Sequence, residues 1–226
     1  MNPTTLILVA GGKGVRMGSA IPKQFLPLAG KPVLYHSANA FLKVFPEIKI
    51  VLVLPSEHIS YGNILLQAFD TLIDLTIVAG GETRFHSVQN GLKAANSEGI
   101  IFVHDAVRPL ISAALILNCY HQAASMGSAI PAMAVTDSIR HWNGEKFVAI
   151  DREMLRSVQT PQTFKAEIIQ NAFRQEYAER FTDEATVVEA FGEQIHLIEG
   201  FKENIKITTP EDLIVAETWM QQHECL

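Results

Sequence analysis

Short apolar runs alternate with helical patterns along this chain of 226 residues, and this alternation restricts the possible folds more than any other feature. The apolar runs are residues 6–10, 48–54, 75–78 and 99–103, and the helical patterns are residues 33–45, 57–69, 87–92 and 113–125. Strands that alternate with helices usually pair in parallel through right-handed crossovers. We therefore expect an α/β fold with a doubly wound, mostly parallel central sheet, in a single domain spanning residues 1–226.

A glycine-rich loop, residues 10–18, follows the first apolar run and continues into Pro22-Lys23-Gln24-Phe25. Glycines allow a tight turn and bring backbone N–H groups close to an anion. Arg16 and Lys23 add two cations to the same segment. The loop predicts a phosphate site, and the alternative is a surface turn with solvated basic residues.

Two better-known glycine motifs do not fit this loop. A dinucleotide fingerprint requires glycine where Met17 stands, and a P-loop ends in Gly-Lys-Ser/Thr, which is absent here. Pro22, Pro27 and Pro32 disfavour a helix directly after the glycines, so we expect an open loop of about twenty residues.

Polar motifs also follow the third and fourth apolar runs. Residues 80–84 read Gly-Gly-Glu-Thr-Arg, and residues 104–109 read His-Asp-Ala-Val-Arg-Pro. Open α/β sheets bind ligands outside the carboxyl ends of their strands. We therefore expect these two motifs to meet the glycine-rich loop at one ligand site.

Charge and cysteine usage exclude several classes of protein. The formal net charge of −6 argues against a surface that binds nucleic acid. Cys119 and Cys225 lack paired spacing, which favours a reducing cytoplasm over a disulfide framework or a zinc site. The first apolar run is too short for a signal sequence or a membrane span.

Asn143-Gly144 separates two strand-like runs, residues 137–142 and 145–150, and predicts a β-hairpin within residues 133–152. An isolated hairpin is only marginally stable in water, so this one needs a surface to pack on. That surface belongs either to another subunit or to its own domain.

The last third of the chain contains further elements. A helix is expected through residues 168–173, and strands at 195–198 and 204–207. Thr182 is expected to cap a helix with an acidic first turn, and residues 209–212 to open the terminal helix. Within 204–207, alternation places Lys206 on the face opposite its two isoleucine neighbours.

The motif Gly-Gly-x-Gly-x-Arg-Met-Gly at residues 11–18, followed by residues 22–25, resembles the nucleotidyltransferases that activate sugar and polyol phosphates. With Arg84-x-x-Ser-Val-x-Asn-Gly and Gln-Thr-Pro-Gln at 159–162, the chain is similar to the 2-C-methyl-D-erythritol 4-phosphate cytidylyltransferases of the non-mevalonate isoprenoid pathway. The resemblance implies a Rossmann-like nucleotidyltransferase fold and a homodimer joined by the hairpin arm. It also implies cytidylyl transfer from CTP by in-line attack of the acceptor phosphate on the α-phosphorus, with release of pyrophosphate.

The resemblance also implies roles for individual residues, together with Mg²⁺ as the metal that accompanies CTP. The implied catalytic residues are Arg16, Lys23, Arg152 and Lys206. The implied nucleotide-binding residues are Ala10, Gly11, Gly12, Gly14, Gly80, Gly81, Glu82, Ser87, Asp105 and Ala106. The implied acceptor-binding residues are Arg108, Thr160 and Thr182, and Asp105 is the implied residue near the metal.

Several of these residues also have an ordinary structural interpretation. Lys206 alone is a typical edge-strand lysine, and Asp105 is placed to cap the next helix. Ser87 is equally suited to a helix terminus, while Thr160 precedes a proline and Thr182 is a natural cap.

Three other functions remain open from the residues alone. A ribitol-5-phosphate cytidylyltransferase shares most of the nucleotide-side motifs. A non-catalytic nucleotide-binding module of the same fold is a second alternative. A glycosyltransferase of similar architecture is the least favoured, because the chain lacks an Asp-x-Asp motif.

Overall fold

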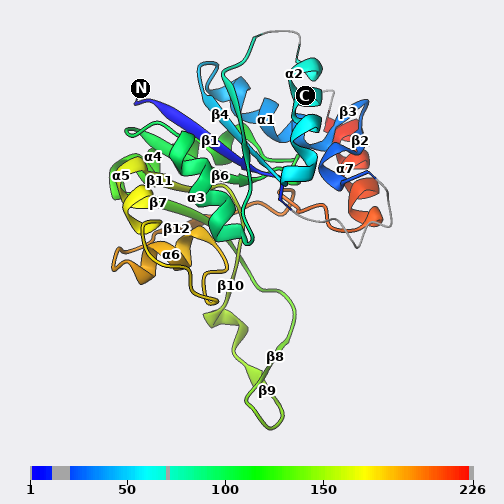
Figure 1. Cartoon of the computed structure of the whole chain (residues 1–226). Helices are drawn as coiled ribbons and strands as arrows, with labels where there is room; N and C mark the ends of the chain where they lie inside the picture. Colours follow the sequence, from blue (N-terminus) through cyan, green and yellow to red (C-terminus); the bar gives the residue numbers. More distant parts are fainter. Residues whose placement is uncertain (1, 12–20, 70–71, 224–226) are drawn as a thin grey trace.

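The central element of the fold is a twisted sheet of eight strands (Figure 1). The structure is a computed structural model, and it describes residues 2–11, 21–69 and 72–223. The strand order is β10-β7-β11-β6-β1-β4-β5, and β12 also pairs with β7. The strands are β1 (Thr4–Val9), β4 (Lys49–Leu54), β5 (Leu75–Ala79), β6 (Ile100–Asp105), β7 (Ser128–Ala134), β10 (Arg156–Val158), β11 (Gln162–Lys165) and β12 (Leu197–Glu199).

Most of the sheet is parallel, as the sequence predicts. In the centre, Ile7 of β1 is in register with Val51 of β4 on one side and with Val103 of β6 on the other. β4 pairs in parallel with β5, whereas β11 runs antiparallel to both β6 and β7. The carboxyl ends of β1, β4, β5 and β6 therefore meet at one edge of the sheet.

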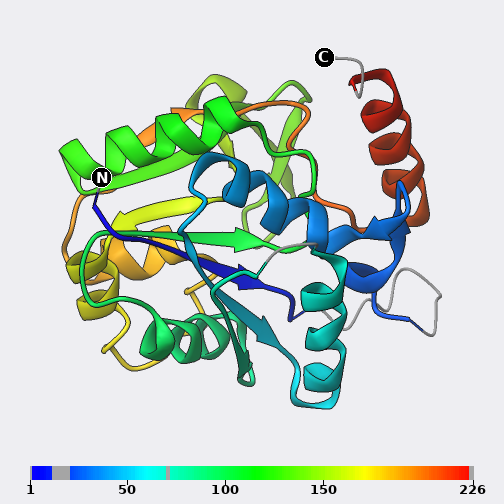
Figure 2. The same ribbon diagram turned by 90° about the horizontal axis from the view of Figure 1, so that it is seen from above.

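Helices cover both faces of the sheet (Figure 2). They are α1 (Val33–Val44), α2 (Gly62–Ala68), α3 (Arg84–Ala94), α4 (Ala113–Met126), α5 (Ala166–Ala172), α6 (Glu184–Ala190) and α7 (Pro210–His223). Side chains alternate along each strand. Leu6 and Leu8 accordingly pack in one core with α1 and α4, while Ile7 and Val9 pack in a second core with α3, α5 and α6. Burial of these two faces fixes the register of β1.

The predicted hairpin forms, and it projects away from the rest of the chain (Figure 1). β8 (Ile139–Trp142) pairs antiparallel with β9 (Phe147–Ile150). Gly144 at the turn has a φ of 99°, a conformation that favours glycine. Trp142 and Phe147 contact each other yet stay 57% and 68% exposed. The hairpin therefore does not lie on its own domain, and we call residues 135–155 the arm.

Short elements occupy the described part of the long open loop expected after the glycines, and residues 12–20 of that loop lie outside the described residues. From residue 21 onward, the described chain contains the 3₁₀ helix η2 (Lys23–Phe25) and a ribbon formed by β2 (Pro27–Leu28) and β3 (Lys31–Pro32). The helix expected at 57–69 is also divided, into the 3₁₀ helix η3 (Ser56–Tyr61) and α2. A third 3₁₀ helix, η4 (Arg152–Met154), lies in the arm.

Two predictions in the last third of the chain are wrong. Residues 204–207 do not form a strand. The N–H of Ile207 donates to the carbonyl of Val107 at 2.8 Å, but the N–H of Ile205 donates to the carbonyl of Glu203 at 2.7 Å, within the same segment. Asp183, not Thr182, caps α6, because its Oδ1 accepts the N–H of Thr186 at 2.9 Å. The start of α7 is as predicted, with the carboxylate of Asp212 accepting the N–H of Thr209 at 2.9 Å.

A membrane-spanning helix is not found among the residues that the structure describes, since none of their helices is both long and apolar enough.

Candidate active site

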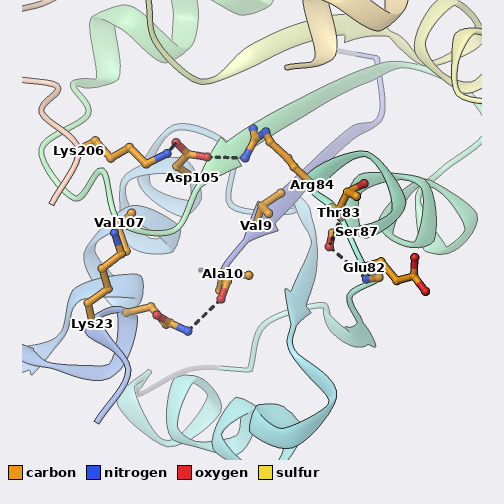
Figure 3. Close-up of a pocket in the computed structure, with 13 residues that line it drawn as sticks. Val9, Ala10, Lys23, Glu82, Thr83, Arg84, Ser87, Asp105, Val107 and Lys206 are labelled. Atoms are coloured by element: carbon orange, nitrogen blue, oxygen red, sulfur yellow. Dashed lines mark hydrogen bonds and ion pairs between the residues drawn. The ribbon is translucent and has the colours of Figure 1, made fainter. Parts of the chain in front are cut away.

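A cavity of about 260 Å³ lies at the carboxyl ends of β1, β5 and β6 (Figure 3). It collects the three polar motifs that the sequence places after separate strands. The residues that line it are Val9, Ala10, Gly11, Lys23, Gln24, Gly81, Glu82, Thr83, Arg84, Ser87, Asp105, Val107 and Lys206. The sheet topology thus brings together segments that are distant in sequence, and the site resembles those of other open α/β folds.

One wall of the cavity is the loop from β5 to α3, which Ser87 holds in place. The Ser87 hydroxyl accepts the N–H of Gly81 at 3.1 Å and donates to the carbonyl of Thr83 at 2.9 Å. A β-carbon on Gly81 would come within 2.4 Å of the β-carbon of His86, so the loop needs glycine there. The carboxylate of Glu82 points away from the other pocket residues (Figure 3).

The opposite wall is η2, which hydrogen bonds attach to the core. Gln24 Nε2 donates to the carbonyl of Ala10 at 2.9 Å, directly after β1. Lys23 Nζ donates to the carbonyl of Ile207 at 2.8 Å, although the Lys23 side chain is buried. These two bonds hold an ammonium group beside the cavity, next to the segment that carries Lys206.

Asp105, at the end of β6, is surrounded by three cationic side chains. Its Oδ1 accepts Arg84 Nη1 at 2.7 Å, and its Oδ2 lies 2.9 Å from Lys206 Nζ. Arg108 Nε is 3.6 Å from the same Oδ2. Arg84 also reaches Glu184 of α6, whose Oε2 accepts Nη2 at 3.0 Å. Three segments of the chain, those of Asp105, Arg84 and Lys206, therefore meet at one buried carboxylate, and α6 joins them through Arg84.

The charged forms of Asp105 and Arg84 are stabilised for identifiable reasons, whereas burial opposes the charged form of Glu184. Burial opposes the ionised form of Asp105, but Arg84, Lys206 and Arg108 outweigh it and hold the pKa of the carboxyl well below its usual range. Burial also opposes the charge of Arg84, yet the carboxylates of Glu184 and Asp105 raise the pKa of the guanidinium above its ordinary value. For Glu184, burial dominates and raises the pKa.

Asp105 is held from behind by a chain of hydrogen bonds through Thr160 and His104. Thr160 Oγ1 accepts the N–H of Asp105 at 3.1 Å and contacts His104 Nδ1 at 3.1 Å. His104 Nε2 lies 3.2 Å from the carbonyl of Arg108. A carbonyl can only accept, so Nε2 carries the proton and Nδ1 accepts the Thr160 hydroxyl. Burial lowers the pKa of His104 to about 4, which keeps the ring neutral.

Asn204 attaches the segment that carries Lys206 to this chain of hydrogen bonds. Its Nδ2 donates to the carbonyl of Thr160 at 2.8 Å, and its backbone carbonyl accepts Arg108 Nη1 at 2.7 Å. The side chains of Ile205 and Ile207 pack with a small core beneath α7. Lys206 therefore faces Asp105, on the side that sequence alternation predicts, even though no strand forms.

Several implied site residues do not line this cavity. Gly80 and Ala106 sit behind it in backbone hydrogen bonds, with Gly80 N–H donating to Leu54 and Ala106 N–H donating to Val9. Arg108 and Thr160 support Asp105, as described above. The expectation that Asp105 caps the next helix is wrong, because the cap of α4 is Ser112, whose Oγ accepts the N–H of Leu115 at 3.2 Å.

Two further implied residues lie elsewhere, and three fall outside the described part of the chain. Thr182 is exposed in the loop before α6. Arg152 lies in the arm, where its Nη1 donates to the carbonyl of Thr136 at 2.6 Å. Gly12, Gly14 and Arg16 lie outside the residues that the structure describes.

Comparison with known proteins assigns the family. The family model described as IspD, 2-C-methyl-D-erythritol 4-phosphate cytidylyltransferase, matches residues 4–222. The chain belongs to this family. It is 45% identical over 212 residues to the 2-C-methyl-D-erythritol 4-phosphate cytidylyltransferase of Phocaeicola vulgatus, covering 94% of this chain and 97% of that protein. The corresponding protein of Bacteroides thetaiotaomicron is 46% identical, with the same coverage.

Solved structures of cytidylyltransferases from this family share the fold. The 4-diphosphocytidyl-2C-methyl-D-erythritol synthase of Anaerococcus prevotii superposes with a TM-score of 0.81 at 27% identity, covering 97% of this chain and 96% of that one. The 2-C-methyl-D-erythritol 4-phosphate cytidylyltransferase of Francisella tularensis gives a TM-score of 0.76 at 32% identity, covering 96% and 99%. The expected nucleotidyltransferase fold is confirmed.

The sequence motifs do not identify two side chains of this cytidylyltransferase site, Arg84 and Glu184, as site residues. Arg84 lies within the polar motif after β5, so its place beside the cavity can be inferred once the sheet order is known. Glu184 lies 100 residues further along the chain, and its sequence context indicates only an acidic helix start. Its contact with the site follows from the packing of α6 against α3.

Proposed function

We propose that this chain transfers a cytidylyl group from CTP to 2-C-methyl-D-erythritol 4-phosphate, and that the cavity at the carboxyl ends of β1, β5 and β6 binds the CTP. The observation that carries the proposal is the meeting of Lys23, Lys206 and the Gly81–Ser87 loop around one cavity, in a chain of the cytidylyltransferase family. The products are 4-diphosphocytidyl-2-C-methyl-D-erythritol and pyrophosphate.

The two walls of the cavity suit the two ends of CTP. The loop held by Ser87 offers backbone groups and a hydroxyl, which can recognise the amine and carbonyl of a cytosine ring. Lys23 and Lys206 lie at the other wall, which η2 and the segment around residue 207 form, and there they can contact the triphosphate. The glycine-rich loop begins at Ala10 and Gly11 on the same edge, and Arg16 follows in that loop.

The chemical step needs positioning and positive charge more than it needs a nucleophilic side chain. An oxygen of the acceptor phosphate forms a bond to the α-phosphorus of CTP, and the bond from that phosphorus to the bridging oxygen breaks as pyrophosphate leaves. Charge that develops on the α-phosphate oxygens would be stabilised by the cations of Lys23 and Arg16. The buried backbone bond of Lys23 places its ammonium before CTP arrives.

Mg²⁺ fits this site as a metal that enters with the nucleotide. Within the described residues, no group of three or more His, Cys, Asp or Glu side chains could hold a metal by itself. Mg²⁺ commonly binds through one or two carboxylates plus substrate phosphates and water. Asp105, whose carboxylate is ionised at the cavity wall, is the residue that we assign beside it. When bound, the metal would neutralise charge on the phosphates.

The acceptor site is proposed to form between two subunits of a homodimer. Arg152 lies in the arm, which projects away from the rest of the chain (Figure 1). Exposed Trp142 and Phe147 give the arm an apolar surface that a second copy could cover. Arg152 would then contact the acceptor phosphate in the partner's site, where Arg108, Thr160 and Thr182 complete our proposed acceptor-binding set.

The cellular setting that we propose is the cytoplasm, without nucleic-acid or membrane partners. The net charge of −6 is unsuited to binding a polyphosphate backbone over a broad surface. Cys119 is buried as a free thiol in the core, where burial raises its pKa to about 12 and keeps it unreactive.

Pyrophosphate release tests this function directly. The protein is incubated with CTP, Mg²⁺ and either 2-C-methyl-D-erythritol 4-phosphate or ribitol 5-phosphate. We expect release with the erythritol phosphate and a loss of kcat on the order of 100-fold in Lys23→Ala. The exposed Lys43 on α1 provides the control, and Lys43→Ala should retain kcat. Activity with ribitol 5-phosphate alone would reject the acceptor, and no release with either acceptor would favour a non-catalytic module.

A further inference from the structure

Glu184 is connected to the CTP cavity by a row of side chains with alternating charge. Its Oε2 accepts Arg84 Nη2 at 3.0 Å, and Arg84 Nη1 donates to Asp105 Oδ1 at 2.7 Å. The other oxygen of Asp105 lies 2.9 Å from Lys206 Nζ. Figure 3 shows the Arg84, Asp105 and Lys206 part of this row along the upper wall of the cavity. Glu184 does not line the cavity, and its contact with a residue that does is the ion pair with Arg84. An influence of Glu184 on the cavity is therefore expected to act through Arg84.

The backbone around Glu184 is fixed by hydrogen bonds from a neighbouring strand. Asp183 and Thr186 form a capping box at the start of α6. Gln162 of β11 then bridges this turn, accepting the N–H of Ala185 at 2.8 Å and donating to Asp183 Oδ2 at 2.8 Å. These hydrogen bonds hold the backbone of Glu184 in one position, so its carboxylate is not a mobile surface group.

The position of Glu184 is costly for a carboxylate. Its side chain is 1% exposed, and aromatic rings of the second core, Phe85, Phe173 and Phe181, lie around it and Arg84. Ion pairs buried in this way add little net stability, because desolvation offsets the Coulombic attraction, and well-packed apolar residues often serve equally well. The stability of the fold therefore does not account for a carboxylate at this position. A need for negative charge next to the site does account for it.

The charges of the cluster show what that requirement is. Asp105 has one carboxylate to share among Arg84, Lys206 and the more distant Arg108. Glu184 gives Arg84 a second anion. Without Glu184, Asp105 would be the carboxylate that pairs with Arg84, and this stronger attraction would weaken the ion pair between Asp105 and Lys206.

We propose that Glu184 is a positioning residue for cytidylyl transfer: by pairing with Arg84, it weakens the attraction of Arg84 for Asp105, so that the second oxygen of Asp105 holds Lys206 at the cavity. This inference rests on the proposed function, because it assigns Lys206 to the triphosphate. Arg84 transmits the effect, since its planar guanidinium presents separate N–H groups to the two carboxylates.

A double-mutant cycle on the full-length protein tests this connection. The variants are Glu184→Gln, which keeps an oxygen acceptor but removes the charge, Asp105→Asn, and the two combined. We expect Glu184→Gln alone to lower kcat/KM for CTP about tenfold, and to lower it less than about twofold when Asp105 is already Asn. Glu189→Gln, an exposed change on the same helix, is the control and should leave kcat/KM unchanged.

The cycle separates positioning from a structural role. If Glu184 only supported the fold, its substitution would cause the same loss in both backgrounds, and that additivity would overturn the proposal. The absence of any loss from Glu184→Gln in the wild-type background would also overturn it. Urea unfolding at the assay temperature confirms that each variant is folded.

Two further measurements keep the inference testable on its own. If Glu184→Gln does not fold, Arg84→Lys replaces it in the cycle, because a lysine cannot present a planar fork to two carboxylates; the same non-additivity with Asp105→Asn is expected, and additivity would refute the connection. The cycle is also run on the Kd for CTP without acceptor. Non-additive CTP binding in a protein that transfers to neither acceptor would contradict the proposed function while supporting the role of Glu184.

Discussion

Protonation of His104 should make the stability of this protein depend on pH in a predictable window. The ring is fully buried in β6, where it accepts a hydrogen bond from the Thr160 hydroxyl and donates one to the carbonyl of Arg108. Burial lowers the pKa of His104 from 6.5 to about 4. Between these two values the unfolded chain binds a proton that the folded chain excludes. The stability that depends on neutral His104 is therefore fully present above pH 6.5 and is lost progressively as the pH falls towards 4.

The magnitude follows from the shift. Each pKa unit is worth about 1.4 kcal/mol, and at pH 5 most of the unfolded-state histidine is already protonated. We expect His104 alone to lower the free energy of unfolding by about 2 kcal/mol at pH 5 relative to pH 7.5. Glu184 contributes with the opposite sign, because its raised pKa favours the folded state at low pH. The contribution of His104 must therefore be isolated by substitution.

Urea unfolding at pH 5 and pH 7.5 measures this contribution. In His104→Gln, which keeps an N–H donor for the carbonyl of Arg108, the difference in unfolding free energy between the two pH values should shrink by about 2 kcal/mol. His121→Gln, an exposed change on α4, should leave the wild-type difference in place. If His104→Gln showed the same difference as wild type, the neutral buried imidazole and the proton assignment built on it would be wrong.

Three further predictions concern packing, CTP binding and the subunit arrangement. Gly91→Ala should destabilise the fold by about 1 kcal/mol in urea unfolding, because its β-carbon would lie 2.8 Å from Ile7 Cγ2 and this overpacking exceeds the gain in helix propensity; an increase in stability would contradict it. Ser87→Ala should raise the KM for CTP about tenfold with little change in thermal stability, since the N–H of Gly81 loses its acceptor; an unchanged KM would remove this loop from the nucleotide site. Mixed dimers of Lys23→Ala and Arg152→Ala subunits should recover part of the activity that each variant lacks alone, and no recovery in verified mixed dimers would argue against a shared site.

Much of the fold could be predicted because its pattern is local. β1, β4 and β6 are apolar enough on both faces to be recognised as buried parallel strands, and the Asn143-Gly144 turn identifies the hairpin directly. The errors occur where tertiary contacts override local preference. Residues 204–207 alternate like a strand, but hydrogen bonds from Asn204 to the carbonyl of Thr160 and from Arg108 to the backbone carbonyl of Asn204 hold them in place outside the sheet.

The candidate site divides in the same way. Lys23, the Gly81–Ser87 loop and Asp105 could be expected to meet, because each follows the carboxyl end of a strand in the sheet. The connection from Glu184 through Arg84 could not, because it depends on the packing of α6 against the amino end of α3. The spacing of residues within a short segment does not indicate contacts with a segment far away in the sequence.

The position of bound CTP tests the central claim most directly. A crystal structure with CTP and Mg²⁺ should place the cytosine against Gly81 and Ser87, and the triphosphate between Lys23 and Lys206 beside Asp105. A nucleotide bound away from these residues, or one whose phosphates lie at the Ser87 loop, would contradict the assignment of this cavity as the active site.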